Sequence, residues 1–125
     1  MGDKDSSNDA AAHMRSRLRA DLLTAMRDRR KLEVELIREL VAAIDNAEAP
    51  PRHDGAATAT SVRHEFGSGS AEVERLVLSR ADVDALLLNE IERRERAAGE
   101  FERLGEAERA RALRAEAVVA KRYVV

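Results

Sequence analysis

The sequence predicts an all-α domain in which two antiparallel helical hairpins pack as a four-helix bundle. Apolar residues recur at spacings of three and four along four long segments, which is the period of an amphipathic helix. Pro50, Pro51 and a stretch rich in Gly, Ser and Thr divide these segments into two pairs. The apolar content is mostly Ala and Leu, and the only aromatic residues are Phe66, Phe101 and Tyr123. The core must therefore come from helices that approach closely.

The first pair of helices is predicted over residues 15–28 and 31–48. In the first segment the apolar residues recur every four positions, at Met14, Leu18, Leu22 and Met26. In the second they recur at three and four, at Leu32, Leu36, Ile37, Leu40, Val41 and Ile44. Two helices joined by so few residues must run antiparallel if their apolar faces share a core. The second helix should end before Pro50, because proline disfavours helical geometry in the residue before it.

Residues 49–78 are expected to form a long loop between the hairpins. Gly55, Gly67 and Gly69 lie in this segment, with Ser and Thr scattered between them. Two runs within it, TSVRHEF and AEVERLVL, are separated by GSGS and could instead form a small β-hairpin. The sequence leaves both alternatives open.

The second pair of helices is predicted over residues 80–103 and from about Glu106 to about Tyr123. Ser79 and Asp82 have the spacing of a capping box, with Asp in the place of the usual Glu. Only Arg94 interrupts the apolar stripe that follows, and its long stem can cover apolar surface. Gly105 lies where a helix end favours a residue able to adopt positive φ, so the chain should reverse there. Alanines along the last helix should let the two helices approach closely.

Residues 1–13 are expected to be a disordered leader, and residues 14–125 a single domain. The first thirteen residues are polar and unpatterned and precede a second methionine, Met14, which is typical of a cloning leader or a natural tail. Residues 14–125 carry 21 basic and 21 acidic residues, so net charge points to no polyanionic partner. No run approaches the ~20 apolar residues of a membrane span, and there is no cysteine or signal peptide. These features favour a cytoplasmic protein.

The sequence shows no group of residues suited to catalysis, to a metal or to a cofactor. His53 and His64 lie in the loop segment, where convergent ligands are hard to hold. Three carboxylates, Glu90, Glu92 and Glu95, have arginines at helical neighbour spacings, which favours a face of ion pairs. No nucleophile has a base in reach, so we expect no catalysis by this chain alone.

Positive charge is concentrated near the N-terminus, where residues 14–31 have a local excess of five positive charges. The candidate nucleic-acid residues are Arg15, Arg19, Arg27, Arg29, Arg30 and Lys31. Clustered arginines at one end of a hairpin can contact phosphates. The same cluster also suits a solvated helix C-terminus, where cations interact favourably with the helix dipole. No aromatic residue that could stack on a base accompanies the cluster.

Several segments together resemble the YqeY-like family. They are DLLTAM, LVAAIDNAE, the helix start at Leu78-Ser79, EIERRERAAGEFERLG, and a last helix with Glu116 that leads to a tyrosine. This family, also called the GatB/YqeY domain, is related to the C-terminal region of the B subunit of the tRNA-dependent amidotransferase. The resemblance implies two helical hairpins separated after NAEAPP. Family members generally continue from the tyrosine as Tyr-Leu-Pro into a second small helical domain, whereas this sequence reads Tyr123-Val124-Val125, so the resemblance covers the first helical part only.

Two functions are compatible with these observations. One is a non-catalytic accessory module, linked by resemblance to tRNA-dependent amidation, in which the basic cluster contacts tRNA or another RNA. The other is a helical interaction module that recognises a protein partner through its grooves or through loop 49–78, with no nucleic acid involved.

Overall fold

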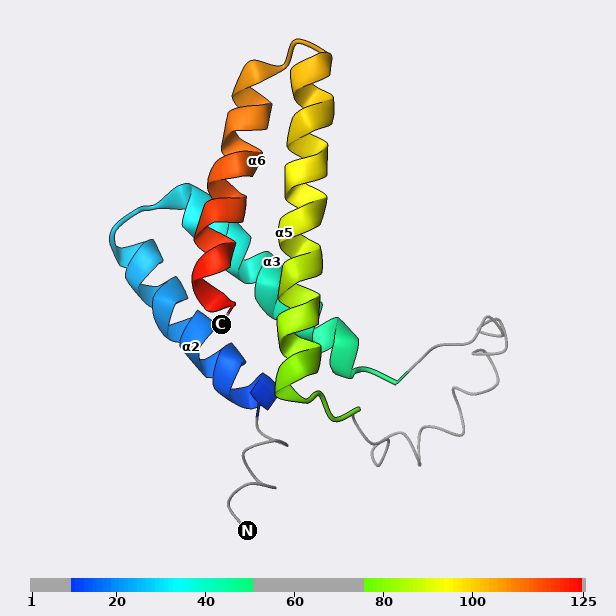
Figure 1. Ribbon diagram of the computed structural model, residues 1–125. Coiled ribbons are helices and arrows are strands. Elements are labelled where there is room, and N and C mark those ends of the chain that lie inside the picture. The colour runs from blue at the N-terminus through cyan, green and yellow to red at the C-terminus, as the bar shows by residue number, and fades with distance from the viewer. Residues whose placement is uncertain (1–9, 51–75, 125) are drawn as a thin grey trace, which may run out of the picture.

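The computed structural model describes residues 10–50 and 76–124, and this part of the chain is almost entirely helical (Figure 1). Helices α2 (Ala10–Arg27) and α3 (Lys31–Glu48) form one hairpin. Helices α5 (Arg80–Arg103) and α6 (Ala107–Ala120) form the other, and a 3₁₀ turn, η2 (Lys121–Tyr123), follows α6. The predicted all-α fold of two packed antiparallel hairpins is confirmed.

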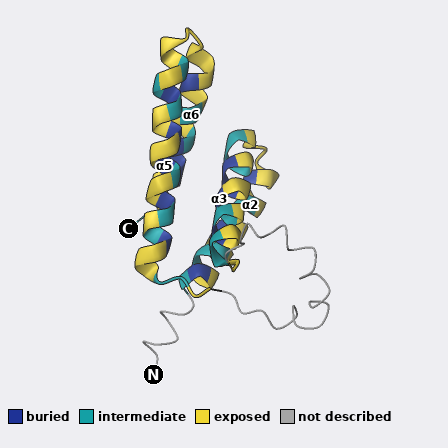
Figure 2. Ribbon diagram, turned by 90° about the vertical axis from the view of Figure 1, so that its right-hand side faces the viewer, coloured by how far each residue is buried: buried dark blue, intermediate teal, exposed yellow. Residues whose placement is uncertain are grey.

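The two hairpins lie face to face as two layers. Figure 2 shows α2 and α3 on one side of the α5–α6 pair, whose turn extends beyond the first hairpin. Within residues 10–50 and 76–124, no helix combines the length and apolar character that crossing a membrane requires.

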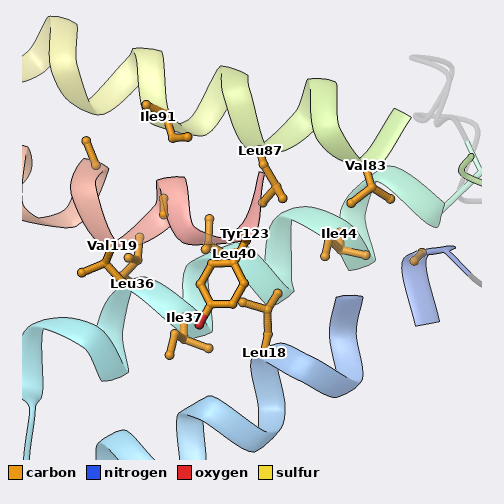
Figure 3. Packing of buried hydrophobic residues seen from close by; sticks show 13 residues of the cluster. Leu18, Leu36, Ile37, Leu40, Ile44, Val83, Leu87, Ile91, Val119 and Tyr123 are labelled. Atoms are coloured by element: carbon orange, nitrogen blue, oxygen red, sulfur yellow. The ribbon is translucent and has the colours of Figure 1, made fainter. Parts of the chain in front are cut away.

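The core lies where the layers meet, and every described helix contributes to it (Figure 3). α2 supplies Leu18, and α5 supplies Leu87 among others. α3 contributes most, with Leu36, Ile37, Leu40 and Ile44 at most 1% exposed. The ring of Tyr123 lies among these aliphatic side chains in Figure 3. Burial of each such side chain stabilises the folded state by roughly 1.5–3 kcal/mol, so the apolar junction is what joins the two hairpins.

Small residues form the seam between α5 and α6. Ala98 of α5 and Ala110, Ala117 and Ala120 of α6 are all at most 1% exposed, and the last two belong to the core cluster. The side chains of Arg114 and Glu102 bridge the two helices with paired bonds of 3.0 Å. The alanines therefore allow the close approach that the sequence predicts.

The predicted start of α5 and the reversal at Gly105 are confirmed, whereas α6 ends at Ala120, three residues before its predicted end. The Asp82 backbone N–H donates to Ser79 Oγ and the Ser79 N–H donates to Asp82 Oδ2, each at 3.0 Å, which completes the capping box. Gly105 has φ 81° in the turn after α5. At the end of the first hairpin, α3 stops at Glu48 and Ala49 is extended, as expected before Pro50.

Helix α2 begins at Ala10, five residues before its predicted start. The expectation of a disordered leader is therefore wrong for residues 10–13, while residues 1–9 lie outside the described part of the chain. Alanine has the highest helix propensity, and Ala11 lies seven residues before Leu18 on the same helix face. Ala11 is 2% exposed and belongs to the core cluster. Its burial extends the helix beyond the pattern that the larger apolar residues define.

The ends of the connection between the hairpins lie next to each other. The Leu76 backbone N–H donates to the carbonyl oxygen of Glu48 at 2.8 Å. This backbone bond holds the described end of the first hairpin beside the start of the second. The alternative β-hairpin falls on residues 60–78. Residues 76–78 are described and are not in a strand, and residues 60–75 lie outside the described ranges.

Candidate nucleic-acid interface

The structure divides the six candidate basic residues into two groups, and Arg15 belongs to the group with structural roles. Its Nε donates to Asp45 Oδ1 at 3.0 Å and its Nη2 donates to Glu48 Oε1. The Arg15 side chain is only 14% exposed. This geometry ties α2 to α3, so Arg15 is not available to a ligand.

Arg30 is also paired with acidic side chains. Its guanidinium lies 3.4 Å from a carboxylate oxygen of Asp28 and 3.4 Å from one of Glu33. Arg30 occupies the N-cap position of α3, where its side chain makes no capping hydrogen bond. Its charge is therefore largely neutralised at the turn.

The remaining four candidates, Arg19, Arg27, Arg29 and Lys31, form what we call the basic turn patch. All four are exposed, and none has an acidic partner within residues 10–50 and 76–124. They extend from the middle of α2 across the turn to the first residue of α3. Arg19 and Arg27 are eight residues apart, which is about 12 Å along a helix.

The helix dipole favours two members of the patch but not Lys31. Arg27 lies in the last turn of α2 and Arg29 lies just beyond its C-terminus, where a cation is favourable. Lys31 is the first residue of α3, at the positive end of its dipole, where a cation is unfavourable. The alternative of a solvated helix end therefore leaves Lys31 unexplained.

Arg29 occupies a backbone position that glycine normally takes. Its φ is 58°, and it is the one positive-φ non-glycine residue in the described part of the chain. The Arg30 N–H donates to the Ala25 carbonyl at 2.9 Å and the Arg29 N–H to the Met26 carbonyl at 3.2 Å, which is the Schellman pattern. The left-handed conformation costs a residue with a Cβ roughly 1–2 kcal/mol.

The turn between α5 and α6 can be compared with the turn at Arg29, because both have the same hydrogen-bond pattern. There the N–H groups of Gly105 and Glu106 donate to the carbonyls of Glu102 and Phe101, in the same pattern. Glycine supplies the left-handed residue at φ 81°. The first turn therefore uses an arginine where the second uses the residue that the geometry favours.

Exposed apolar residues accompany the basic turn patch. Leu23 is 62% exposed and lies between Arg19 and Arg27 on α2, with Met26 half-exposed beside it. Tyr123, the aromatic residue of the adjoining core, is buried. The patch can therefore contact phosphates through its cations, but it has no ring on which a base could stack.

Arg17, which also lies in the basic stretch, joins the two hairpins. Its guanidinium lies over the Tyr123 ring, 4.6 Å from the centroid, and its Nη2 donates to the Arg122 carbonyl at 3.1 Å. The Tyr123 hydroxyl donates to Asp21 Oδ2 at 2.5 Å. Burial raises the pKa of Tyr123 above its usual range, and the bond to Asp21 raises it further. No sequence signal connects residues more than a hundred positions apart.

A second polar site is a groove of about 690 Å³ between the hairpins, with Arg94 at its centre. Arg94 is 8% exposed. Its Nε donates to Glu116 at 2.9 Å, its Nη1 donates to the Glu90 side chain at 2.8 Å, and its Nη2 donates to Glu39. Burial lowers the Arg94 pKa, but the bonds to Glu90 and Glu116 outweigh it and leave the pKa raised. Arg94 is therefore a buried ion-pair centre, which the apolar stripe of the sequence did not predict.

Two of the three carboxylates considered for acid–base chemistry, Glu90 and Glu95, are used in ion pairs. Glu90 is paired with Arg93 at 3.4 Å as well as with Arg94, as its helical spacing predicts. Glu95 is paired with Lys121 of η2 at 3.2 Å instead of with a neighbour on its own helix. In residues 10–50 and 76–124 no three His, Asp or Glu residues converge as metal ligands would. His53 and His64 lie outside the described residues.

Comparison with known proteins gives no match: no protein-family model, no curated protein and no solved structure is similar to this chain.

Proposed function

We propose that this chain is a non-catalytic accessory module whose basic turn patch contacts RNA phosphates. The observation that carries the proposal is the patch itself, in which four exposed cations lack acidic partners within the described residues. Two of them stand where the fold does not favour them, Arg29 at a left-handed position and Lys31 at the positive end of a helix. A ligand that carries negative charge gives these side chains a role.

The chemistry of the patch favours a phosphate backbone over unpaired bases. Arginine and lysine contact phosphate oxygens and release condensed counterions, which makes binding salt-dependent. Recognition of unpaired bases needs stacking side chains, which the described patch lacks. A folded RNA is the ligand that fits best. The sequence resembles the YqeY-like family, which is linked to tRNA-dependent amidation. We therefore propose tRNA as the RNA ligand.

The test is fluorescence anisotropy of labelled tRNA titrated with the chain at low and at near-physiological salt. The double variant Arg27→Ala/Lys31→Ala should bind more weakly than the native chain, and it should lower the slope of log K against log salt by about one for each lost phosphate contact. Both residues are exposed, so the fold should be retained.

The matched control is Arg80→Ala/Arg96→Ala. It removes two exposed arginines that have no acidic partner within the described residues and that lie on α5, so the net charge changes by the same amount. If both double variants weakened tRNA binding equally, net charge alone would explain the binding, and the assignment to the basic turn patch would be overturned. No binding at low salt would overturn the RNA proposal and leave recognition of a protein partner as the function to test.

A further inference from the structure

The groove around Arg94 is separate from the basic turn patch. Residues of α3, α5 and α6 line its volume of about 690 Å³, which lies within the usual range of small-molecule sites. No residue of the basic turn patch is among those that line it. A ligand held in this groove is therefore distinct from the RNA proposed above.

Glu39 is the least firmly held of the three carboxylates that bind Arg94. Its side chain is 60% exposed, whereas those of Glu90 and Glu116 are 13% and 20% exposed. It accepts a bond from Arg94 Nη2, whereas Nε and Nη1 bind the two more buried carboxylates. An ion pair with so exposed a member contributes little to stability. The Glu39 carboxylate can therefore leave Arg94 while the other two stay in place.

The charges that line the groove balance only when Glu39 is counted. Three arginines and three glutamates take part: Arg93, Arg94, Arg96, Glu39, Glu90 and Glu116. Arg93 pairs with Glu90 at 3.4 Å. Arg96, one turn further along α5, is exposed and has no acidic partner within residues 10–50 and 76–124. Once the Glu39 side chain turns away, the lining has an excess of one positive charge, which a ligand with a single negative charge would neutralise.

Apolar side chains line the groove beside its charged groups. They are Ala42 and Ala43 of α3, Ala97 of α5 and Leu113 of α6. Ala43 lies one turn after Glu39, and Ala97 lies one turn after Arg94, so each is a neighbour of a charged residue on its own helix. The alanine side chains are short and leave room for a hydrocarbon chain, whose burial is favourable. The groove therefore offers a cation for an acid group and apolar surface for a short chain attached to it.

We propose that the groove binds a small monocarboxylate with a short apolar chain, and that Glu39 occupies the carboxylate position in the free protein. The ligand carboxylate replaces Glu39 as the acceptor for Arg94 Nη2, and the exposed Arg96 adds positive potential. The hydrocarbon chain covers Ala43 and Ala97. Glu39 and the ligand thus compete for the same donor.

The geometry selects a carboxylate over other charged groups. The bond to Arg94 Nη2 is one that a carboxylate of this chain already makes. A dianion such as phosphate would exceed the single positive charge left by Glu39, and it would lie near the carboxylates of Glu90 and Glu116. A cationic ligand would meet the unpaired charge of Arg96.

The test is an NMR titration of the full ¹⁵N-labelled chain with hexanoate, and hexanamide is the neutral control of the same shape. Hexanoate should shift the guanidinium signals of Arg94 and the backbone amide signals of Ala43 and Ala97, and it should bind with a millimolar Kd. Hexanamide should leave these signals in place, because it cannot replace a carboxylate on a guanidinium.

Four variants test the competition and the role of charge. Glu39→Ala removes the competing carboxylate and should tighten hexanoate binding about tenfold, because the closed form lowers the apparent affinity by the fraction of open molecules. Glu35→Ala, one turn earlier at an exposed position outside the groove, should leave the Kd unchanged. Arg96→Ala should weaken binding about threefold, whereas Arg80→Ala, at the distant start of α5, should not.

Three results would overturn the proposal. One is a hexanoate titration that shifts no groove signal in either the native chain or Glu39→Ala. Another is equal tightening by Glu39→Ala and Glu35→Ala, because net charge would then explain the change. The third is an equal response to hexanamide, because the groove would then bind the apolar chain without recognising a carboxylate. Circular dichroism of each variant confirms that it is folded.

Discussion

Arg94 shows how a cation can occupy the apolar stripe of a helix. Carboxylates from α3, α5 and α6 surround its guanidinium, so one side chain links both hairpins. The fork of five donors suits this arrangement, whereas a lysine ammonium could not reach the same acceptors in the same plane. The sequence shows the position of Arg94 in the stripe and its helical neighbour Glu90, but not Glu39, which lies 55 residues away.

Replacement of Arg94 should strongly destabilise the fold. Arg94→Met keeps the apolar stem and removes the charge, which leaves Glu90 and Glu116 without their main partner. Loss of one member of a buried ion pair costs about 3–5 kcal/mol, and we expect the lower end because Glu39 is largely exposed. Chemical denaturation measures the change.

The adjacent residue supplies the control for Arg94. The side chain of Arg93 is 63% exposed and pairs with the same Glu90. Arg93→Met should change the free energy of unfolding by no more than about 1 kcal/mol, as is usual for surface pairs. Similar effects of the two substitutions would show that Arg94 is not an ion-pair centre.

At the scale of the helices, the sequence predicts those starts, ends and turns that depend on residues close together in the chain. The capping box at Ser79, the reversal at Gly105 and the stop before Pro50 depend on residues within a few positions of one another, and all three are confirmed. The start of α2 was missed, because alanine adds little to an apolar pattern until another element buries it. The pairing of Arg15 with α3 depends on tertiary contacts, which the sequence does not display.

Loss of the α5 cap should destabilise the bundle measurably. Ser79→Ala removes the side-chain acceptor for the Asp82 N–H at the start of the longest described helix, while the backbone N–H of residue 79 can still donate to Asp82. We expect a loss of about 1 kcal/mol in the free energy of unfolding. Ser16→Ala is the matched control, since Ser16 is exposed within α2 and alanine is the better helix former there. Equal losses in the two variants would exclude a capping contribution.

At the scale of the whole molecule, Tyr123 connects the end of the chain to its beginning. Its hydroxyl donates to Asp21 of α2, and its ring lies in the core that both hairpins share. It is the one tyrosine of the sequence, and there is no tryptophan, so its ionisation can be followed directly by absorbance. The basic turn patch lies outside this core, so its residues can be changed without unfolding the bundle.

The raised pKa of Tyr123 predicts a loss of stability in alkali. The folded state holds the phenol proton to higher pH than the unfolded chain, whose tyrosine titrates near the usual value of about 10. The stabilisation is complete below about pH 10 and is lost as the pH rises through the folded-state pKa. The difference in unfolding free energy between the native chain and Tyr123→Phe should therefore shrink above about pH 10. If absorbance showed that Tyr123 ionises in the folded protein with the usual pKa of about 10, this prediction would be contradicted.

The most direct test of the proposed function is to replace Arg29 by glycine and measure stability and tRNA binding together. Glycine removes the strain of the left-handed position, so Arg29→Gly should raise the free energy of unfolding by about 1 kcal/mol. If the basic turn patch binds RNA, the same substitution should weaken tRNA binding and lower its salt slope by about one. A variant that is more stable and binds tRNA as well as the native chain, or a native chain that does not bind tRNA, would contradict the account.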